Sequence, residues 1–142
     1  MANWCEGTLK IRGAKKHLLD FLNNGIEQCE GFKIEDYGEG MYLQIPDNTY
    51  IKGTSRAFIM PCDVYMDTDH IIVFDAMQAW SFKTEEWQAI SEKYHIDIRL
   101  YGFEQGMEFN KEIEILNGKV TINNVIEFND YRWECISPNI GG

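Results

Sequence analysis

The chain has 142 residues, a length typical of one domain with a single hydrophobic core. Its 44% hydrophobic and 25% charged residues are ordinary for a globular protein, and no apolar run is long enough to cross a bilayer. The net charge of −10 at pH 7 repels phosphate, so direct binding of DNA or RNA is not expected. No basic region followed by an apolar stretch marks the beginning of the sequence, which predicts a cytoplasmic protein without a signal peptide.

The first part of the chain predicts a strand and then a helix. Residues 4–12 alternate between apolar and polar positions, as in a half-buried strand. Residues 14–27 carry apolar side chains at helical spacing, and Asn24-Gly25 is a typical helix end. Residues 27–47 are rich in glycine and contain short β-prone pieces such as "MYLQI", and two further short pieces follow, "TYIKG" and "RAFIM".

The next part repeats this alternation. Ile71 to Phe74 form a continuous apolar run, which is typical of a central strand buried on both faces or nearly so. A second helix is predicted from Thr84, which is expected to cap it, with Trp87 and Ile90 on its apolar face. Residues 95–103 alternate again and predict another strand.

The C-terminal part predicts β-structure throughout. Asn117-Gly118 is a type I′ turn pair between two alternating stretches and therefore predicts a hairpin. Residues 124–136 predict one or two further strands, turned at Asn129-Asp130. In order, the elements predict an α+β fold, namely a ferredoxin-like βαββαβ sandwich with both helices on one face of an antiparallel sheet and a C-terminal hairpin extension. We expect a single domain over residues 1–142, with its core at about 3–103 and the extension at about 104–142.

Four cysteines are spread along the chain, and the first and last of them lie close to tryptophans. A reducing cytoplasm disfavours disulfides, and no pair has the C-x-x-C spacing. If a late strand lies beside the first one, Cys5, Cys62 and Cys135 become candidate zinc ligands, with His70 or His95 as the fourth. Structural zinc is the one cofactor that the sequence suggests. The alternatives are inert thiols in the core, where free cysteine is common, or a redox role.

No arrangement of residues indicates an enzyme. The three histidines and four cysteines suggest no particular pair of nucleophile and base. Paired carboxylates are explained by helix polarity, by the outward face of the hairpin and by a turn. The sequence contains no calcium-binding loop, no phosphate-binding glycine loop and no G-x-S-x-G motif. We therefore predict a protein that acts by binding.

The segment from residue 104 to residue 134 combines acidic residues with aromatic ones. Acidic residues speed and select an encounter with a basic protein, and aromatic residues supply binding energy. The alternative is that these side chains form ordinary solvated strand faces. The predicted partner-binding residues are Glu104, Glu108, Phe109, Glu112, Glu114, Tyr131 and Trp133.

Three stretches of the chain resemble a known family. They are "MANWCEGTLKIRG", "YIKGTSRAFI" and the ending "YGFEQGMEFNKEIEILNGK … YRWECISPNIGG". They are similar to the YubB-like proteins of bacteriophages, prophages and plasmids, which begin with an Asn-Trp-Cys motif that matches Asn3-Trp4-Cys5. The resemblance implies a ferredoxin-like domain and a gene of a mobile element. The family has no established reaction, so no catalytic residue is implied.

Two hypotheses for function follow from the resemblance and the charge. The first is an acidic protein that inhibits a host defence system such as a type II CRISPR nuclease, by binding the nuclease and blocking access of nucleic acid to its positively charged channel. The second is a structural or regulatory binding module of a phage or plasmid, which dimerises through an open sheet edge. The expected protein is therefore a monomer or a homodimer with a basic protein partner.

Overall fold

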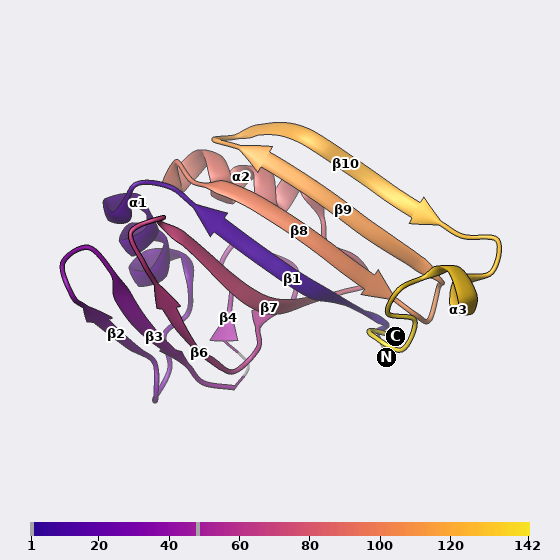
Figure 1. The fold of residues 1–142 in the computed structure, drawn as a ribbon, viewed down its shortest axis with the longest axis horizontal. Helices are drawn as coiled ribbons and strands as arrows, with labels where there is room; N and C mark the ends of the chain where they lie inside the picture. Colours follow the sequence, from indigo (N-terminus) through magenta and orange to yellow (C-terminus); the bar gives the residue numbers. More distant parts are fainter. Residues whose placement is uncertain (1, 48) are drawn as a thin grey trace.

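The structure is a computed structural model that describes residues 2–47 and 49–142. Its main element is a seven-stranded antiparallel sheet with the strand order β10-β9-β8-β1-β7-β5-β4 (Figure 1). The strands of this sheet are β1 (Trp4–Arg12), β4 (Thr49–Tyr50), β5 (Ala57–Ile59), β7 (Ile71–Ala79), β8 (Asp97–Glu104), β9 (Phe109–Leu116) and β10 (Lys119–Glu127). Strand β1 is central, because it pairs along its length with β7 on one side and with β8 on the other.

A second sheet lies at the opposite end of the molecule from the C-terminal helix (Figure 1). It contains β2 (Lys33–Asp36), β3 (Met41–Ile45) and β6 (Cys62–Met66), in the order β2-β3-β6. The inner side chains of β3 are buried in the same hydrophobic core as the large sheet. The two sheets therefore share one core and belong to one folding unit.

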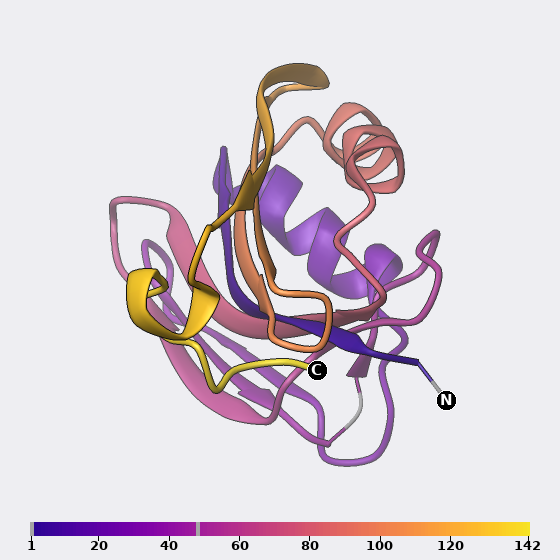
Figure 2. The ribbon, with the colours of Figure 1, turned by 90° about the vertical axis from the view of Figure 1, so that its right-hand side faces the viewer.

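The helical segments are short. They are α1 (Lys15–Asp20), the π-helical turn η1 (Phe21–Gly25), α2 (Thr84–Tyr94) and α3 (Tyr131–Glu134). Figure 2 shows α1 and α2 on one face of the large sheet and α3 on the other. The side chains of Leu18, Phe21 and Trp87 fill the core between the helices and the sheet. No helix in the described part of the chain has the length and apolar character needed to cross a membrane.

The predicted ferredoxin-like βαββαβ sandwich is wrong. The protein is mostly β, with a seven-stranded sheet and a separate three-stranded sheet, and its helices are short. The short β-prone pieces before residue 61 were predicted without partners, and they form β2, β3 and the outer strands β4 and β5. Strand β6, which completes the second sheet, was not predicted, because Cys62 was expected at a turn. The predicted first helix has six α-helical residues before it widens into η1. These short elements pair with distant strands, and a local pattern does not identify such partners.

Two further predictions about the strands are wrong. Ile71 to Phe74 are not buried on both faces, because Ile72 and Phe74 point into the core while Val73 is 46% exposed. Residues 124–136 do not form extra strands turned at Asn129-Asp130. After β10 ends at Glu127, the backbone forms α3, in which the amide of Glu134 donates to the carbonyl of Asp130.

A buried amide connects α2 to the sheet. The side-chain oxygen of Gln78 accepts hydrogen bonds from the indole of Trp87 at 3.0 Å and from the backbone amide of Lys83 at 3.1 Å. Its nitrogen donates to Glu86 at 2.6 Å, and Glu86 also accepts from the backbone amide and hydroxyl of Ser55. Burial of Glu86 acts against ionisation, but the hydrogen bonds from Ser55 and Gln78 outweigh it and lower the pKa of this carboxyl.

Candidate interaction surface

The last residues of the chain fold back onto the face of the large sheet that α1 and α2 leave open (Figure 2). We call residues 130–142 the C-terminal strap. The amide of Gly142 donates to the carbonyl of Trp4 at 2.8 Å, and the amide of Trp4 donates to the carbonyl of Gly142 at 3.4 Å. The two ends of the chain are therefore neighbours, held by paired backbone hydrogen bonds.

Two buried side chains fix the strap to the sheet. The hydroxyl of Tyr131 donates to Oδ1 of Asn110 at 2.9 Å, and Nδ2 of Asn110 lies 3.5 Å from Sγ of Cys135 and 3.2 Å from the hydroxyl of Tyr101. Burial raises the pKa of Tyr131, so its hydroxyl stays protonated and donates. Because the polar groups of this cluster satisfy one another, the strap has a defined position on the sheet.

Two large apolar side chains of the strap point into solvent. Trp133 is 85% exposed and Ile136 is 87% exposed, although Tyr131 and Cys135 beside them are buried. Glu127, Asp130 and Glu134, which are close to this pair in the sequence, are exposed, and so is the basic Arg132. We call Trp133 and Ile136 the apolar pair. An exposed tryptophan on a fixed segment is a typical anchor of a protein interface.

Two of the predicted partner-binding residues are not available for contact. The carboxylate of Glu104 is fully buried and accepts hydrogen bonds from the backbone amides of Gly106 at 2.7 Å and Met107 at 2.9 Å. It therefore holds the turn between β8 and β9. The second of these residues is Tyr131, whose buried side chain holds the strap on the sheet through its hydrogen bond to Asn110. The assignment of these two residues to a contact surface is wrong because their side chains point into the protein.

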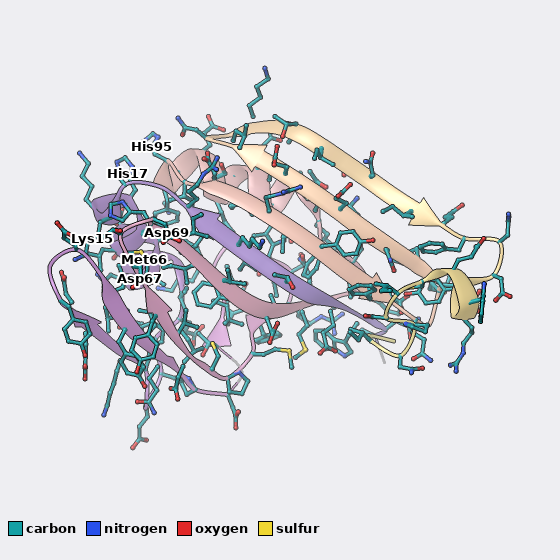
Figure 3. The ribbon with its side chains drawn as sticks, viewed as in Figure 1. Lys15, His17, Met66, Asp67, Asp69 and His95 are labelled. Carbon is teal, nitrogen blue, oxygen red and sulfur yellow. The ribbon has the colours of Figure 1, made fainter. Side chains whose placement is uncertain are left out.

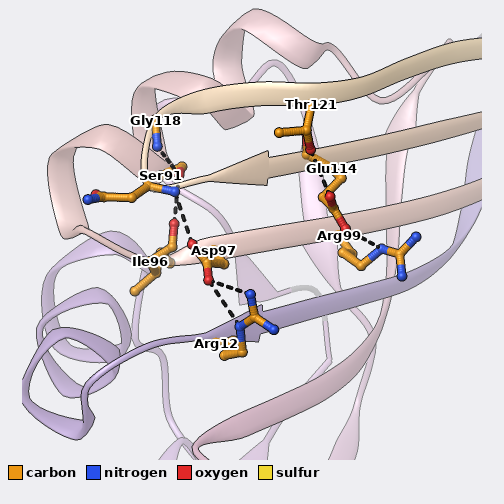
Figure 4. Close-up of polar contacts among 9 residues, drawn as sticks. Arg12, Ser91, Ile96, Asp97, Arg99, Glu114, Gly118 and Thr121 are labelled. Carbon is orange, nitrogen blue, oxygen red and sulfur yellow. Dashed lines mark hydrogen bonds and ion pairs between the residues drawn. The ribbon is translucent and has the colours of Figure 1, made fainter.

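Of the other predicted residues, Glu112 and Glu114 lie on the open face of the sheet. Phe109 alternates with them and lies on the face that carries Ile113 and Ile115. Glu114 pairs with Arg99 at 3.2 Å and accepts a hydrogen bond from the hydroxyl of Thr121 at 2.7 Å (Figure 4). Glu112, on the same face of β9, accepts a long hydrogen bond of 3.5 Å from Asn124. Glu108 is exposed in the turn before β9, and Phe109 is half-buried. Of the predicted set, Trp133 and Glu108 are exposed side chains, and the rest are partly or fully engaged within the fold.

Figure 4 also shows the polar contacts at the end of the hairpin. Asp97 accepts two hydrogen bonds from Arg12, at 2.8 and 3.0 Å, and one from the backbone amide of Asn117 at 3.0 Å. The hydroxyl of Ser91 donates to the carbonyl of Ile96 at 2.6 Å and accepts from the amide of Gly118 at 2.8 Å. These contacts join the turn of the hairpin to α2 and β1, so they serve the fold.

A groove lies beside the apolar pair on the open face of the sheet. Its volume is about 440 Å³, and Ile136 forms part of its wall. Tyr101 and Phe103, whose rings meet edge to face at 5.2 Å, line it together with Lys10 and Arg99. Ile136 belongs to this surface but was not among the partner-binding residues predicted from the sequence. Its only signal in the sequence is its position three residues after Trp133, on the other side of the buried Cys135.

The structure does not bring the predicted zinc ligands together. Cys5 lies on β1 in the core, where a Cβ at Gly102 would be 2.5 Å from its Sγ, whereas Cys62 is on β6 in the other sheet. The described residues contain no group of three His, Cys, Asp or Glu side chains that could hold a metal ion. Burial raises the pKa of the Cys5 thiol to about 12, which makes it a poor nucleophile. Cys135 belongs to the anchor of the strap.

Two of the three histidines, His17 and His95, lie next to each other, and His70 is not part of this pair. The rings of His17 and His95 lie 5.4 Å apart at an angle of 50° (Figure 3). Figure 3 also places Lys15, Asp67 and Asp69 at this end of the molecule. Lys15 is already bonded to Asp36 and to the carbonyl of Gly38, and no three of the acidic and imidazole groups here form a metal-binding set among the described residues.

No protein-family model matches the sequence, and no curated protein matches it.

Proposed function

We propose that this protein is a non-enzymatic binding protein that docks onto its partner through the C-terminal strap. The observation that carries this proposal is the exposure of Trp133 and Ile136 on a segment that Tyr131 and Cys135 fix to the sheet. A tryptophan that is exposed but held in place loses little conformational freedom on binding, so most of its burial contributes to affinity. Such residues are enriched among those that dominate interface energies.

The proposed partner is a basic protein. The chain carries a net charge of −10, and the exposed acidic residues beside the apolar pair would lie at the rim of the contact. Charges at a rim speed association and reject acidic partners, and their effect weakens as salt is added. Neither a metal nor a cofactor is part of this proposal.

The specific partner that we propose is a host defence protein such as a type II CRISPR nuclease, in the cytoplasm of the host cell. The acidity of the chain supports it. The resemblance to proteins of mobile elements, which implied a ferredoxin-like domain that the structure does not have, stays a prediction. A nuclease of this class holds its RNA–DNA heteroduplex in a positively charged channel, which an acidic protein would obstruct. The inhibitor would compete with nucleic acid for the channel and would not itself bind nucleic acid.

The test is a cleavage assay with a purified type II nuclease, its guide RNA and a target DNA. We expect cleavage to stop at excess protein and the double variant Trp133→Ala/Ile136→Ala to restore it. Val125→Ala, which truncates an exposed apolar side chain on β10, is the matched control and should inhibit as the unaltered protein does. Unchanged cleavage at excess protein would exclude this nuclease as the partner, and equal inhibition by all three proteins would exclude the strap as the docking site.

The second candidate function is a dimeric structural or regulatory module, and the open edge of the large sheet favours it. In the part of the chain that the structure describes, β10 pairs with β9 on one side and with no strand on the other. Such an edge can pair with the same edge of another copy. Light scattering coupled to size exclusion should then give twice the mass of 16.6 kDa. A monomer mass at all concentrations would reject this candidate.

A further inference from the structure

The outer face of the three-stranded sheet carries three tyrosines. Alternation along the strands sends Met41 and Leu43 into the core and turns the neighbouring side chains outward. Across the sheet, Glu35 pairs with Tyr42, which pairs in turn with Tyr65, so these three side chains form one row. Tyr37 follows β2 directly. We call Tyr37, Tyr42, Tyr65, Glu35 and Asp63 the tyrosine face.

Two rings of this face are open to solvent, and the third, Tyr42, is half-buried beside Tyr65. Tyr65 is 72% exposed and Tyr37 is 65% exposed. The rings of Tyr42 and Tyr65 lie 4.8 Å apart with an angle of 40° between their planes. Large aromatic side chains with this exposure contribute little to the core, and gathered on one face they are characteristic of a contact surface.

Carboxylates hold the tyrosine hydroxyls. The hydroxyl of Tyr42 donates to Asp63 at 3.0 Å, and that of Tyr37 donates to Glu35. These hydrogen bonds raise the pKa values of both tyrosines, which keeps the phenols neutral. Each carboxylate has further lone pairs directed away from its tyrosine, so negative charge lies beside the negative faces of the rings.

The surroundings of this face are acidic. Residues 27–69, which include the whole small sheet, contain nine Asp or Glu residues and three Lys or Arg residues. Of these three basic residues, Lys33 lies on the same outer face of β2. Lys15, which reaches this sheet from α1, is paired with Asp36. The face therefore combines exposed rings with an excess of negative charge, which is complementary to a cation.

We propose that the tyrosine face binds an arginine side chain presented by a partner protein. The planar guanidinium group can stack on the ring of Tyr65 while its N–H groups donate to Glu35 or Asp63 in a forked arrangement. Lysine carries a compact charge without this planar geometry, so arginine should bind more tightly. This site goes beyond the docking proposed for the strap, because it lies on the other sheet, at the far end of the molecule from α3 (Figure 1).

Fluorescence anisotropy with labelled peptides tests this inference. The probes are a fluorescein-labelled peptide of arginines spaced by Gly-Ser and two matched peptides in which lysine or glutamate replaces arginine. We expect the arginine peptide to bind several-fold more tightly than the lysine peptide and the glutamate peptide not to bind. Equal affinity for arginine and lysine would overturn the proposal, because it would reduce the site to general charge attraction.

Variants locate the binding. Tyr65→Ala should weaken binding of the arginine peptide about three- to tenfold, while Tyr65→Phe, which keeps the ring, should retain most of the affinity. Asp63→Asn should weaken binding more than Glu92→Gln, which removes the same charge from an exposed position on α2. Both positions are on the surface, and circular dichroism would verify that each variant is folded. Unchanged binding to Tyr65→Ala would refute the proposal.

The strap variant separates this site from the proposed function. Trp133→Ala/Ile136→Ala should bind the arginine peptide as the unaltered protein does. If this variant loses the peptide while Tyr65→Ala keeps it, the arginine site belongs to the strap and the inference about the tyrosine face is wrong. If neither the unaltered protein nor the strap variant inhibits the nuclease, but binding of the arginine peptide is still weakened by Tyr65→Ala, the proposed partner is wrong and the arginine site stands.

Discussion

Trp133 and Tyr131 lie two residues apart, yet the structure predicts opposite effects of truncating them on stability. Trp133 is almost fully exposed, so Trp133→Ala should change the free energy of unfolding by no more than about 0.5 kcal/mol. Tyr131 is buried, and Tyr131→Ala removes a packed ring together with the donor to Asn110. We expect a loss of about 3–5 kcal/mol, as for other buried aromatic residues.

A third variant separates the hydrogen bond from the packing. Tyr131→Phe keeps the ring but leaves Oδ1 of Asn110 without the hydroxyl that it accepts from, which should cost about 1–3 kcal/mol. For a chain of this length, each kcal/mol corresponds to a fall in Tm of about 3 °C. The three variants should therefore rank as Trp133→Ala, Tyr131→Phe and Tyr131→Ala in order of increasing destabilisation.

Urea unfolding followed by far-ultraviolet circular dichroism is the suitable assay. Tryptophan fluorescence would be confounded, because one of the variants removes a tryptophan. Destabilisation of more than about 1.5 kcal/mol by Trp133→Ala would mean that the ring packs within the fold, and the main support for a docking strap would be lost. A cost below about 1 kcal/mol for Tyr131→Ala would mean that the strap is not fixed to the sheet.

Three other predictions concern the core, the thiols and pH. Gly7→Ala should prevent folding or destabilise it severely, because the new Cβ would lie 1.9 Å from the carbonyl oxygen of Tyr101 in the paired strand; a native dichroism spectrum and melting curve would contradict this. Iodoacetamide should label the exposed Cys29 in the folded protein and Cys5 only after unfolding, as peptide mapping by mass spectrometry would reveal; equal labelling rates would refute the burial of Cys5. The pKa of Glu86 is lowered by folding, so its contribution to stability is complete above the pKa of the unfolded chain, about 4.3, and is lost as the pH falls through the folded value. The free energy of unfolding of Glu86→Gln, measured with urea, should therefore fall less steeply on acidification in this range than that of the unaltered protein. Parallel curves of this free energy against pH for the two proteins would show that the predicted linkage is absent.

Local signals in the sequence were sufficient for two elements. The hairpin of β9 and β10 turns at Asn117 and Gly118, as predicted, because both residues adopt positive φ values, 45° and 86°, that this residue pair tolerates. Helix α2 begins at Thr84, where a helix was expected, because its apolar face repeats at helical spacing. The hydroxyl of Thr84 does not cap the helix, since it donates to Asn123 of β10 at 2.8 Å.

The architecture depended on contacts between distant residues. The sequence of β3 shows the alternation of a strand, but its partners, β2 and β6, are chosen by the core that the three strands share with the large sheet. The same holds for the outward row of Glu35, Tyr42 and Tyr65, which exists only once the register between the strands is set. The predicted ferredoxin-like sandwich failed here, because the sequence does not say which short strands pair.

The binding surface shows this division most clearly. The sequence by itself determined that the C-terminal part is acidic and aromatic, since charge and ring content do not depend on the fold. It did not determine that Tyr131 and Glu104 are buried while Trp133 and Ile136 are exposed. Only the tertiary structure decided this, because the strap has one short helix, α3, and no long periodic pattern. The strap buries the side chains that contact Asn110 on the sheet beneath it, Tyr131 and Cys135, whereas Glu104 is buried because it accepts from the amides of the turn after β8.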